Sequence, residues 1–299
     1  MNKIKNTRII DNFLFYIKNE RKFSIHTIRN YKNDLLKFNE FLFSYDNELN
    51  FLNIDKTAIQ FYIEHCSKNK MSSKTILRRI ASIKSMYKYL TFEGLVDYNI
   101  ASLIIAPKIT KKIPNYLSEK EVLKLMSLPD LNTIDGYMHK SILEIFYSTG
   151  LRISELVRIR IKNLDVKKNV IKISGKGNKE RIVILGLNAS NAIKNYLRVA
   201  KNSNNIYLYS SSYKVDSHLS ESYVYKMVKR YLSKVTNNER MSPHSLRHSF
   251  ATHLLNNGAD LMSVKELLGH EDLSSTQIYT HISIDKIKKI YKQSHPHGK

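Results

Sequence analysis

The sequence has a single cysteine, Cys66, and no tryptophan in 299 residues. One cysteine excludes an intrachain disulfide and any cluster of thiolate ligands, which fits a reducing compartment. Nowhere does the chain approach the roughly 18 consecutive apolar residues that span a bilayer, and Asp11, Asn12 and Lys18 interrupt the apolar stretch near its start. We therefore expect a cytoplasmic protein without a membrane segment, in which Cys66 is a core residue of a helix.

Acidic residues are scarce relative to basic ones. The chain has 26 Asp and Glu against 49 Lys and Arg, which gives a formal charge of +23. Such an excess favours a polyanionic partner, because cationic side chains release its counterions on binding, and it points to nucleic acid. A second explanation stays open. The sequence is rich in Lys, Asn, Ile and Tyr, whose codons are AT-rich, so part of the charge can reflect codon usage.

The length and the few prolines indicate how the chain is divided. At 299 residues it exceeds the usual size of one domain, roughly 100 to 200 residues, so we expect two domains. Two of only five prolines, Pro107 and Pro114, fall in a lysine-containing stretch without helical periodicity, which is typical of an extended, basic linker. We predict a first domain at residues 1–106, a linker at 107–114 and a second domain at 115–299.

Apolar residues in the first domain recur at helical spacing. One stripe follows a helix start at Ser24, and its members are Ile28, Tyr31, Leu35, Phe38 and Leu42. A second stripe consists of Ile76, Ile80, Ile83, Tyr87 and Leu90. With shorter patterns at 9–17 and 54–63, the domain is predicted to be an all-helical bundle.

Basic side chains occupy the outer faces predicted for the second and fourth helices of this bundle. They are Arg29, Lys32, Lys37, Lys74, Arg78, Arg79, Lys84 and Lys88. Such a surface can face nucleic acid, or it can simply be the solvated side of a stable bundle.

The second domain combines helices with a strand pair. Ser118 and Glu121 form a capping-box pattern at a helix start, and Gly150 is placed to end a helix. Two β-branched runs between residues 169 and 185 flank a glycine-rich turn, which predicts a β-hairpin. Further helices are predicted from Ala189, from Ser222, from Pro243 to Gly258 and from Leu261 to Gly269. The predicted fold class is therefore mainly α in two domains, the second being α+β with a small sheet.

Four short segments of the second domain carry groups suited to one reaction. They are residues 149–156 with Arg152, the turn Gly175-Lys176-Gly177, the segment His244-Ser245-Leu246-Arg247-His248, and Gly269-His270 followed by Tyr279. Their order and spacing resemble the tyrosine recombinase (phage integrase) family. Its Xer-type members are also similar in the first domain, at Ser24, Thr27, Tyr31, Asp34, Leu35 and Phe38.

The resemblance implies a SAM-like, core-binding helical bundle as the first domain and a catalytic second domain. It also implies six catalytic residues: Arg152, Lys176, His244, Arg247, His270 and Tyr279. Where Xer-type members commonly carry Asn-Pro before the linker, this chain has Asn99-Ile100, a departure that concerns only the stiffness of the linker.

Metal-free exchange of a DNA phosphodiester needs fixed cations and an in-line nucleophile. A guanidinium group binds two phosphate oxygens and stays charged, and the resemblance implies this role for Arg152 and Arg247. The phenol of Tyr279 has an ordinary pKa of about 10, so nearby cations or His244 must favour the phenolate before it attacks and forms a 3′-phosphotyrosyl bond. Because that bond conserves the ester, rejoining needs neither ATP nor a ligase.

Each of these residues also has a purely structural explanation. Arg152 can pair with Glu155 at i,i+3, and Lys176 can be a solvated turn tip. His270 can complement the dipole of the preceding helix instead of hydrogen bonding to the phosphate, as the resemblance implies. Tyr279 is one of 19 tyrosines and can be a packing residue. The joint occurrence of all six residues in the expected order favours the catalytic interpretation.

Histidine spacing suggests one competing site. His244 and His248 lie four residues apart on a predicted helix, with His253 further on, and could bind a metal ion. No second ligand pair or acidic cluster accompanies them, so we expect neither a metal nor a cofactor. In the resemblance, His248 is a buried structural histidine near the site.

The resemblance implies double-stranded DNA as the partner and a homo- or hetero-tetramer assembled on two recombination sites. We expect no arm-binding domain before Asn12, which favours a Xer-type enzyme that resolves chromosome or plasmid dimers in the cell cycle. A paralogous recombinase and an FtsK-type translocase are then expected partners. Three other possibilities stay open: the integrase of a mobile element, a type IB topoisomerase that relaxes DNA, and a non-catalytic DNA-binding protein.

The C-terminal segment from Asp285 to Gln293 has Ile287 and Ile290 on one side of a predicted helix. The resemblance implies that this helix docks on a neighbouring subunit. It can equally pack on its own domain.

The resemblance assigns Lys176 as the acid that protonates the leaving 5′ oxygen, which gives a first prediction. Lys176→Ala should slow cleavage of ordinary DNA by about 100-fold or more, the usual contribution of a general acid. It should slow cleavage far less when a 5′-bridging sulfur replaces that oxygen, because a thiolate leaves without protonation. Single-turnover cleavage of both duplexes measures this, and equal slowing on the two would exclude the acid role.

Overall fold

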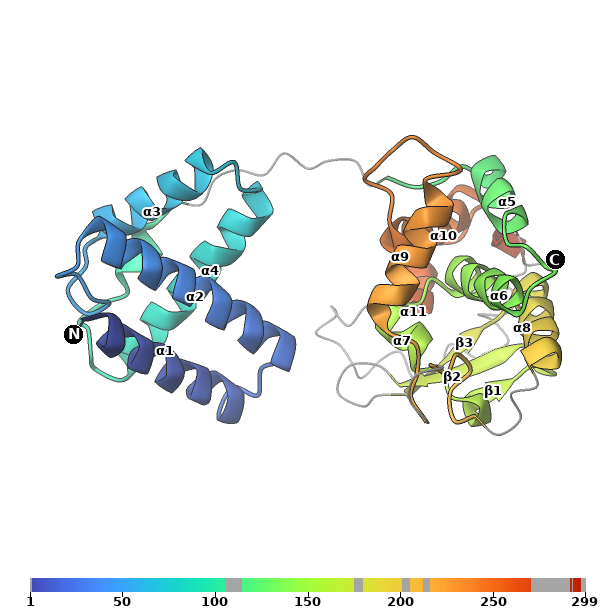
Figure 1. The fold of residues 1–299 in the computed structure, drawn as a ribbon, viewed down its shortest axis with the longest axis horizontal. Coiled ribbons are helices and arrows are strands. Elements are labelled where there is room, and N and C mark those ends of the chain that lie inside the picture. Colours follow the sequence, from blue (N-terminus) through green and yellow to red (C-terminus); the bar gives the residue numbers. More distant parts are fainter. Residues whose placement is uncertain are drawn as a thin grey trace. The chain divides into compact units, whose positions relative to one another are not determined.

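The structure is a computed structural model, and it describes residues 2–105, 115–174, 180–200, 205–211, 216–269, 291 and 293–296. The chain divides into two compact units, Met1–Lys112 and Ile113–Lys299 (Figure 1). Each unit is built around buried apolar clusters of its own. The predicted linker, residues 107–114, lies outside the described residues.

The first unit is a bundle of α-helices. Its elements are α1 (Asn2–Asn19), α2 (Ile25–Tyr45), α3 (Lys56–Lys68), α4 (Ser73–Phe92) and the short 3-10 helix η1 (Ile100–Leu103). Side-chain caps determine three of the starts. Ser24, Asp55 and Ser72 each accept a hydrogen bond from the backbone N–H three residues later, at 3.0 to 3.2 Å. The predicted helical bundle is confirmed.

The predicted apolar stripes form the core of this bundle. Leu35, Phe38 and Leu42 on α2 are fully buried, and the Phe38 ring lies 4.9 Å from the ring of Tyr62 on α3. Cys66, also on α3, is buried as expected. Burial of these side chains, rather than helix propensity alone, holds the four helices together.

A buried carboxylate joins α2 to α4. Asp34 accepts a hydrogen bond from the Ser82 hydroxyl at 2.9 Å and pairs with the guanidinium of Arg78. Arg79 is also close, with its Nε 3.9 Å from Asp34 Oδ1, and it donates to the Tyr62 hydroxyl at 3.0 Å. Arg79 was predicted to lie on an exposed basic face. That assignment is wrong, because its side chain is only 13% exposed and serves these interior groups.

The second unit contains the remaining described elements. They are α5 (Glu119–Ser127), α6 (Ile134–Thr149), α7 (Ile153–Val157), η2 (Ile161–Asn163), β1 (Leu164–Asp165), β2 (Val170–Ser174), β3 (Glu180–Ile184), α8 (Leu187–Ala200), α9 (Glu221–Leu232), α10 (Pro243–Asn256) and α11 (Leu261–Leu268). The predicted capping box opens α5, since the backbone N–H of Ser118 donates to Glu121 Oε2 at 2.8 Å and the Glu121 N–H donates to Ser118 Oγ at 3.3 Å.

The three strands form an antiparallel sheet in the order β1-β2-β3, and Ser174 is paired with Glu180 at the end of the β2–β3 hairpin that borders residues 175–179. This confirms the predicted hairpin. α6, buried along most of its length, packs against α8 and α10 (Figure 1). The mainly α fold with a small sheet is therefore confirmed. None of the helices within the described ranges is long and apolar enough to cross a membrane.

The Asp34 cluster predicts a large effect on the stability of the first unit. Asp34→Ala should lower its free energy of unfolding by about 2 to 4 kcal/mol, because Ser82 and Arg79 lose their partner inside the bundle. Glu40→Ala is the control: Glu40 pairs with Lys37 at 2.7 Å on an exposed face, so its loss should change stability by less than about 0.5 kcal/mol. Hydrogen exchange of the α2 and α4 amides in the full chain measures both, and similar losses in the two variants would contradict the prediction.

Candidate functional site

Three of the six predicted site residues lie in the described part of the chain, all of them in the second unit. They are Arg152, which precedes α7, and His244 and Arg247, both on α10. The other three, Lys176, His270 and Tyr279, lie outside the described residues. Described neighbours flank two of them: β2 and β3 border residues 175–179, and Gly269 ends α11 directly before His270.

A tight reversal of the backbone places Arg152. Gly150 ends α6 in the left-handed conformation, with φ of 59°, and its N–H donates to the Phe146 carbonyl at 2.9 Å. Arg152 then adopts extended backbone at the start of α7, and its side chain is 43% exposed. A charged guanidinium is thereby presented to solvent directly beyond a buried helix.

Arg247 anchors this reversal from the other side. It is only 9% exposed and donates hydrogen bonds to the carbonyl oxygens of Gly150 and Leu268, the latter at 2.8 Å. These carbonyls stand at the C-terminal ends of α6 and α11, where helix carbonyls lack intrahelical partners and the dipole is negative. One guanidinium therefore joins two helix ends, and one of the carbonyls that it binds, that of Gly150, lies two residues before Arg152.

The cation of Arg247 persists at neutral pH in spite of its environment. Burial lowers the pKa of Arg247 to about 10, and repulsion from Arg152 and Arg181 acts in the same direction, while Glu155 opposes it. A guanidinium with this pKa is fully charged at pH 7. The three cations lie near one another, because Arg247 binds the carbonyl of Gly150, two residues before Arg152, and that of Leu268, next to the Gly269 backbone on which Arg181 packs.

His244 enters the site through the first turn of α10. Pro243 occupies the first helical position, where its missing N–H costs nothing, and the Ser242 N–H donates to Ser245 Oγ at 3.2 Å. His244 and Arg247 are three residues apart, so they share one face of the helix. His244 is exposed, at the positive end of the helix dipole.

A shared carboxylate binds two arginines of this site. Glu155 is buried, and its carboxylate accepts hydrogen bonds from Arg152 and from Arg181 on β3, at 3.2 Å and 2.9 Å to the same oxygen. The predicted pairing of Arg152 with Glu155 is confirmed. Burial alone would raise the pKa of Glu155, but hydrogen bonds from Arg181 and the Arg152 backbone, together with both positive charges, outweigh it and lower the pKa.

Arg181 lies in the site but was not among the residues predicted for it. Its position in an alternating strand predicted only a surface or core location. A possible signal was its basic character close after the Lys176 turn in the same hairpin, but local spacing does not say which carboxylate a strand residue will reach.

The two further histidines of α10 differ in burial: His253 is buried, whereas His248 is exposed, so the burial expected for His248 is wrong. The His253 ring nitrogen lies 2.9 Å from the hydroxyl of Tyr147, and burial lowers the pKa of His253. The pKa of His248 is lowered as well, by partial burial first and then by the neighbouring His244 and Arg247. Within the ranges that the structure describes, no group of three or more His, Cys, Asp or Glu side chains is placed to hold a metal ion.

The described residues near the C-terminus pack on their own domain. The Tyr291 hydroxyl lies 2.8 Å from Ser148 Oγ, its ring stacks on His295, and the ring of His295 reaches the Tyr147 carbonyl at 3.1 Å. Ile287 and Ile290, which were expected to dock on a neighbouring subunit, lie outside the described residues, so that expectation stays a prediction.

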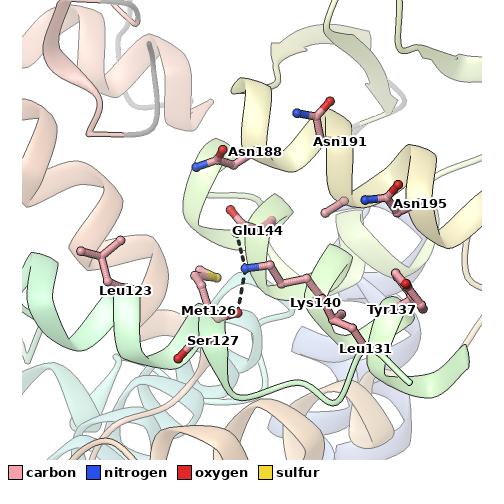
Figure 2. A pocket seen from close by; sticks show the side chains of 11 residues that line it. Leu123, Met126, Ser127, Leu131, Tyr137, Lys140, Glu144, Asn188, Asn191 and Asn195 are labelled. Carbon is pink, nitrogen blue, oxygen red and sulfur yellow. Dashed lines mark hydrogen bonds and ion pairs between the residues drawn. The ribbon is translucent and has the colours of Figure 1, made fainter. Parts of the chain in front are cut away.

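A separate pocket of about 370 Å³ lies among α5, α6 and α8. Figure 2 shows Lys140 pointing between Met126 and Glu144, where it donates to the Met126 carbonyl at 2.7 Å and pairs with Glu144 at 2.9 Å. The lining contains none of the six predicted site residues. This pocket is therefore separate from the site that contains Arg152, Arg181 and Arg247.

Two family models cover most of the chain. Residues 115–285 match the phage integrase family, and residues 10–94 match the phage integrase N-terminal SAM-like domain. Among curated proteins, the chain is 38% identical to the tyrosine recombinase XerC of Pelotomaculum thermopropionicum, over 97% of this chain and 98% of that protein. It is also 38% identical to the tyrosine recombinase XerD of Staphylococcus saprophyticus subsp. saprophyticus, over 96% of this chain and 98% of that protein.

Solved structures share the fold. The XerH site-specific recombinase bound to palindromic difH substrate in a post-cleavage complex has a TM-score of 0.71 at 25% identity, covering 94% of this chain and 83% of that one. A lambda integrase dimer bound to a COC′ core site has a TM-score of 0.71 at 16% identity, covering 93% of this chain and 98% of that one.

The Gly150 reversal predicts a site-specific loss of stability. A Cβ on Gly150 would lie 2.7 Å from side-chain atoms of both Leu268 and Phe250, so Gly150→Ala should destabilise the second unit by about 2 to 5 kcal/mol through strain and overpacking. Gly94→Ala is the matched control, because Gly94 has a similar φ of 68° but nothing within 4 Å of an added Cβ. Backbone strain alone should cost it about 1 to 2 kcal/mol. Thermal unfolding of the full chain compares the two, and equal losses would show that the close packing at Gly150 is unimportant.

Proposed function

This chain belongs to the phage integrase family of tyrosine recombinases, and on that premise we propose that Arg152 and Arg247 bind the DNA phosphate that Tyr279 attacks. The protein is a site-specific recombinase that breaks and rejoins DNA. One observation carries the assignment of the two arginines: the guanidinium of Arg247 is anchored to the carbonyl of Gly150, two residues before the exposed guanidinium of Arg152.

Two guanidiniums held in this way suit a phosphate in the transition state. Its equatorial oxygens gain charge as the nucleophile approaches, and fixed donors stabilise that charge without reorganising. Arg247 is held rigidly by helix carbonyls, whereas Arg152 reaches outward from the start of α7. His244, on the same face of α10 as Arg247, adds a further polar group on the side where the phosphate would lie.

The proposed reaction exchanges one ester for another. The phenolate oxygen of Tyr279 forms a bond to phosphorus, the bond from phosphorus to the 5′ oxygen breaks, and that oxygen takes a proton from Lys176. The DNA strand is then held as a 3′-phosphotyrosyl ester. A 5′ hydroxyl from another duplex reverses these steps, returning the proton and releasing Tyr279. His270 is proposed to donate to the same phosphate.

Support for the DNA partner comes from charge and from a related complex. The formal charge of +23 favours a polyanion, and the XerH relative is bound to a DNA substrate. Exchange between two duplexes cuts four strands, and each chain contributes one Tyr279. We therefore propose a tetramer, of identical or paralogous subunits, assembled on two sites.

The biological role follows from the names of the relatives. XerC and XerD are the names of the two curated recombinases described above, and the similarity to each is equal at 38%. We propose that the chain resolves chromosome or plasmid dimers, with a paralogue as its partner. A contact with an FtsK-type translocase and a cytoplasmic location stay predictions of the resemblance.

Covalent trapping tests the proposed function. With a nicked duplex that carries a candidate recombination site, the wild-type protein should form a denaturation-resistant adduct. Cleavage near the nick releases a short fragment that carries the 5′ hydroxyl, and rejoining stops when this fragment diffuses away. Tyr279→Phe should abolish the adduct and leave DNA binding intact, since it lacks only the nucleophilic oxygen. Denaturing gel electrophoresis and a binding titration measure both.

Tyr225→Phe supplies the matched control. Tyr225 is an exposed tyrosine on α9, and its variant should form adduct like the wild type. An adduct that persists in Tyr279→Phe would refute the nucleophile. Relaxation of supercoiled DNA without any site requirement would instead favour a topoisomerase of the same chemistry.

A further inference from the structure

We propose that Arg181 is a positioning residue for the phosphate-binding guanidinium of Arg152, and that it acts by holding the carboxylate of Glu155. This inference rests on the proposed function of Arg152. None of the six residues matched to the family pattern is Arg181, and its role is drawn from its contacts alone.

The hydrogen bonds make Arg181 the main partner of Glu155. Its two terminal nitrogens donate to the two carboxylate oxygens, at 2.9 Å and 3.0 Å, in the parallel geometry that gives the strongest guanidinium–carboxylate pairs. The side chain of Arg152 makes a longer contact of 3.2 Å with one oxygen. The backbone N–H of Arg152 donates to the other oxygen at 2.9 Å.

The side chains of Arg152 and Arg181 differ in their exposed fractions. The side chain of Glu155 is 7% exposed and that of Arg181 is 22% exposed, whereas that of Arg152 is 43% exposed. Arg181 therefore binds Glu155 from the interior of the unit, and Arg152 lies at the surface, where an anion can reach it. With its negative charge largely compensated by Arg181, Glu155 orients Arg152 without neutralising it.

A second contact connects Arg181 to the end of α11. A Cβ built on Gly269 would lie 2.8 Å from the guanidinium carbon of Arg181 and 2.9 Å from its Nε, so the guanidinium packs directly on the backbone there. Gly269 has φ of 65°, and its lack of a side chain provides the space. Arg181 thus joins β3, the start of α7 and the end of α11, the same helix end that Arg247 binds through Leu268.

Removal of the Arg181 side chain would change the charge balance around Arg152. Without Arg181, the ionised Glu155 would keep its hydrogen bonds to Arg152 only, and its charge would draw that guanidinium inward. The site would lose one cation, and the carboxylate of Glu155 would offset the charge of Arg152 more strongly. The variant Glu155→Gln removes the negative charge but keeps an oxygen that can accept from the Arg152 backbone.

Single-turnover cleavage of a nicked duplex provides the test. Arg181→Ala should reduce the rate at saturating protein by about 10- to 100-fold, as expected when a catalytic group is misplaced, while DNA affinity changes by less than about threefold. The double variant Arg181→Ala with Glu155→Gln should recover about tenfold of that loss, since the uncompensated carboxylate is gone. A role in stability alone predicts no recovery, because the double variant has lost more contacts than the single one.

The leaving group and two further variants complete the design. The loss in Arg181→Ala should be the same on DNA with a 5′-bridging sulfur, because the phosphate is bound in both; a loss confined to ordinary DNA would assign Arg181 to the acid step and overturn the proposal.

Arg181→Lys keeps the charge but not the paired donors, so it should retain the fold and cleave more slowly than the wild type. This variant provides the test if Arg181→Ala unfolds. Arg198→Ala, an exposed arginine on α8, is the control and should cleave normally.

The outcomes separate this inference from the proposed function. If the wild type forms the covalent adduct and Arg181→Ala or Arg181→Lys cleaves at the wild-type rate, the positioning role is wrong and the recombinase assignment stands. If the wild type forms no adduct on a site that it binds, the proposed function fails first, and with it the inference.

Discussion

The site depends on one interaction, the pair of hydrogen bonds that Arg247 donates to the carbonyls of Gly150 and Leu268. A helix end leaves carbonyls without partners, and a buried end must satisfy them in some other way. Here one guanidinium satisfies two ends at once, so α6 and α11 meet at Arg247 and the backbone reversal at Gly150 is held in place. The group proposed to bind the phosphate is therefore also the group that assembles its surroundings.

Charge balance shapes the rest of the site. Arg152 and Arg181 pair with one buried carboxylate, Glu155, and Arg247 binds the backbone two residues before Arg152, which leaves a net positive charge at the site. Burial of so many like charges would be unfavourable without a compensating group and without an anion to complete the site. The arrangement is consistent with a site that is stabilised further when a DNA phosphate occupies it, because the bound anion relieves the repulsion among the cations.

Each unit has a buried carboxylate that lies close to two arginines and joins neighbouring elements. In the first unit Asp34 receives Arg78 and lies near Arg79, and in the second unit Glu155 receives Arg152 and Arg181. In each pair one arginine is exposed and the other is largely enclosed, at 13% for Arg79 and 22% for Arg181. In the first unit the exposed Arg78 is the direct partner of Asp34, whereas in the second unit the enclosed Arg181 makes the paired hydrogen bonds to Glu155. A buried acid with two arginines is thus a recurrent way for this chain to connect a helix to the element beside it.

Local patterns in the sequence determined the elements: the stripe from Ile28 to Leu42 predicted α2, Ser118 with Glu121 predicted the start of α5, and the β-branched runs predicted the hairpin. These features are local because burial of one face and capping of one end depend on residues a few positions apart. Only the tertiary structure decided which charged groups meet. Arg181 reaches Glu155 across 26 residues and Arg247 reaches Gly150 across 97, and Arg79 turns inward to Asp34 and Tyr62 instead of outward. The partner of a long charged side chain is set by which elements pack together, and periodicity carries no information about that.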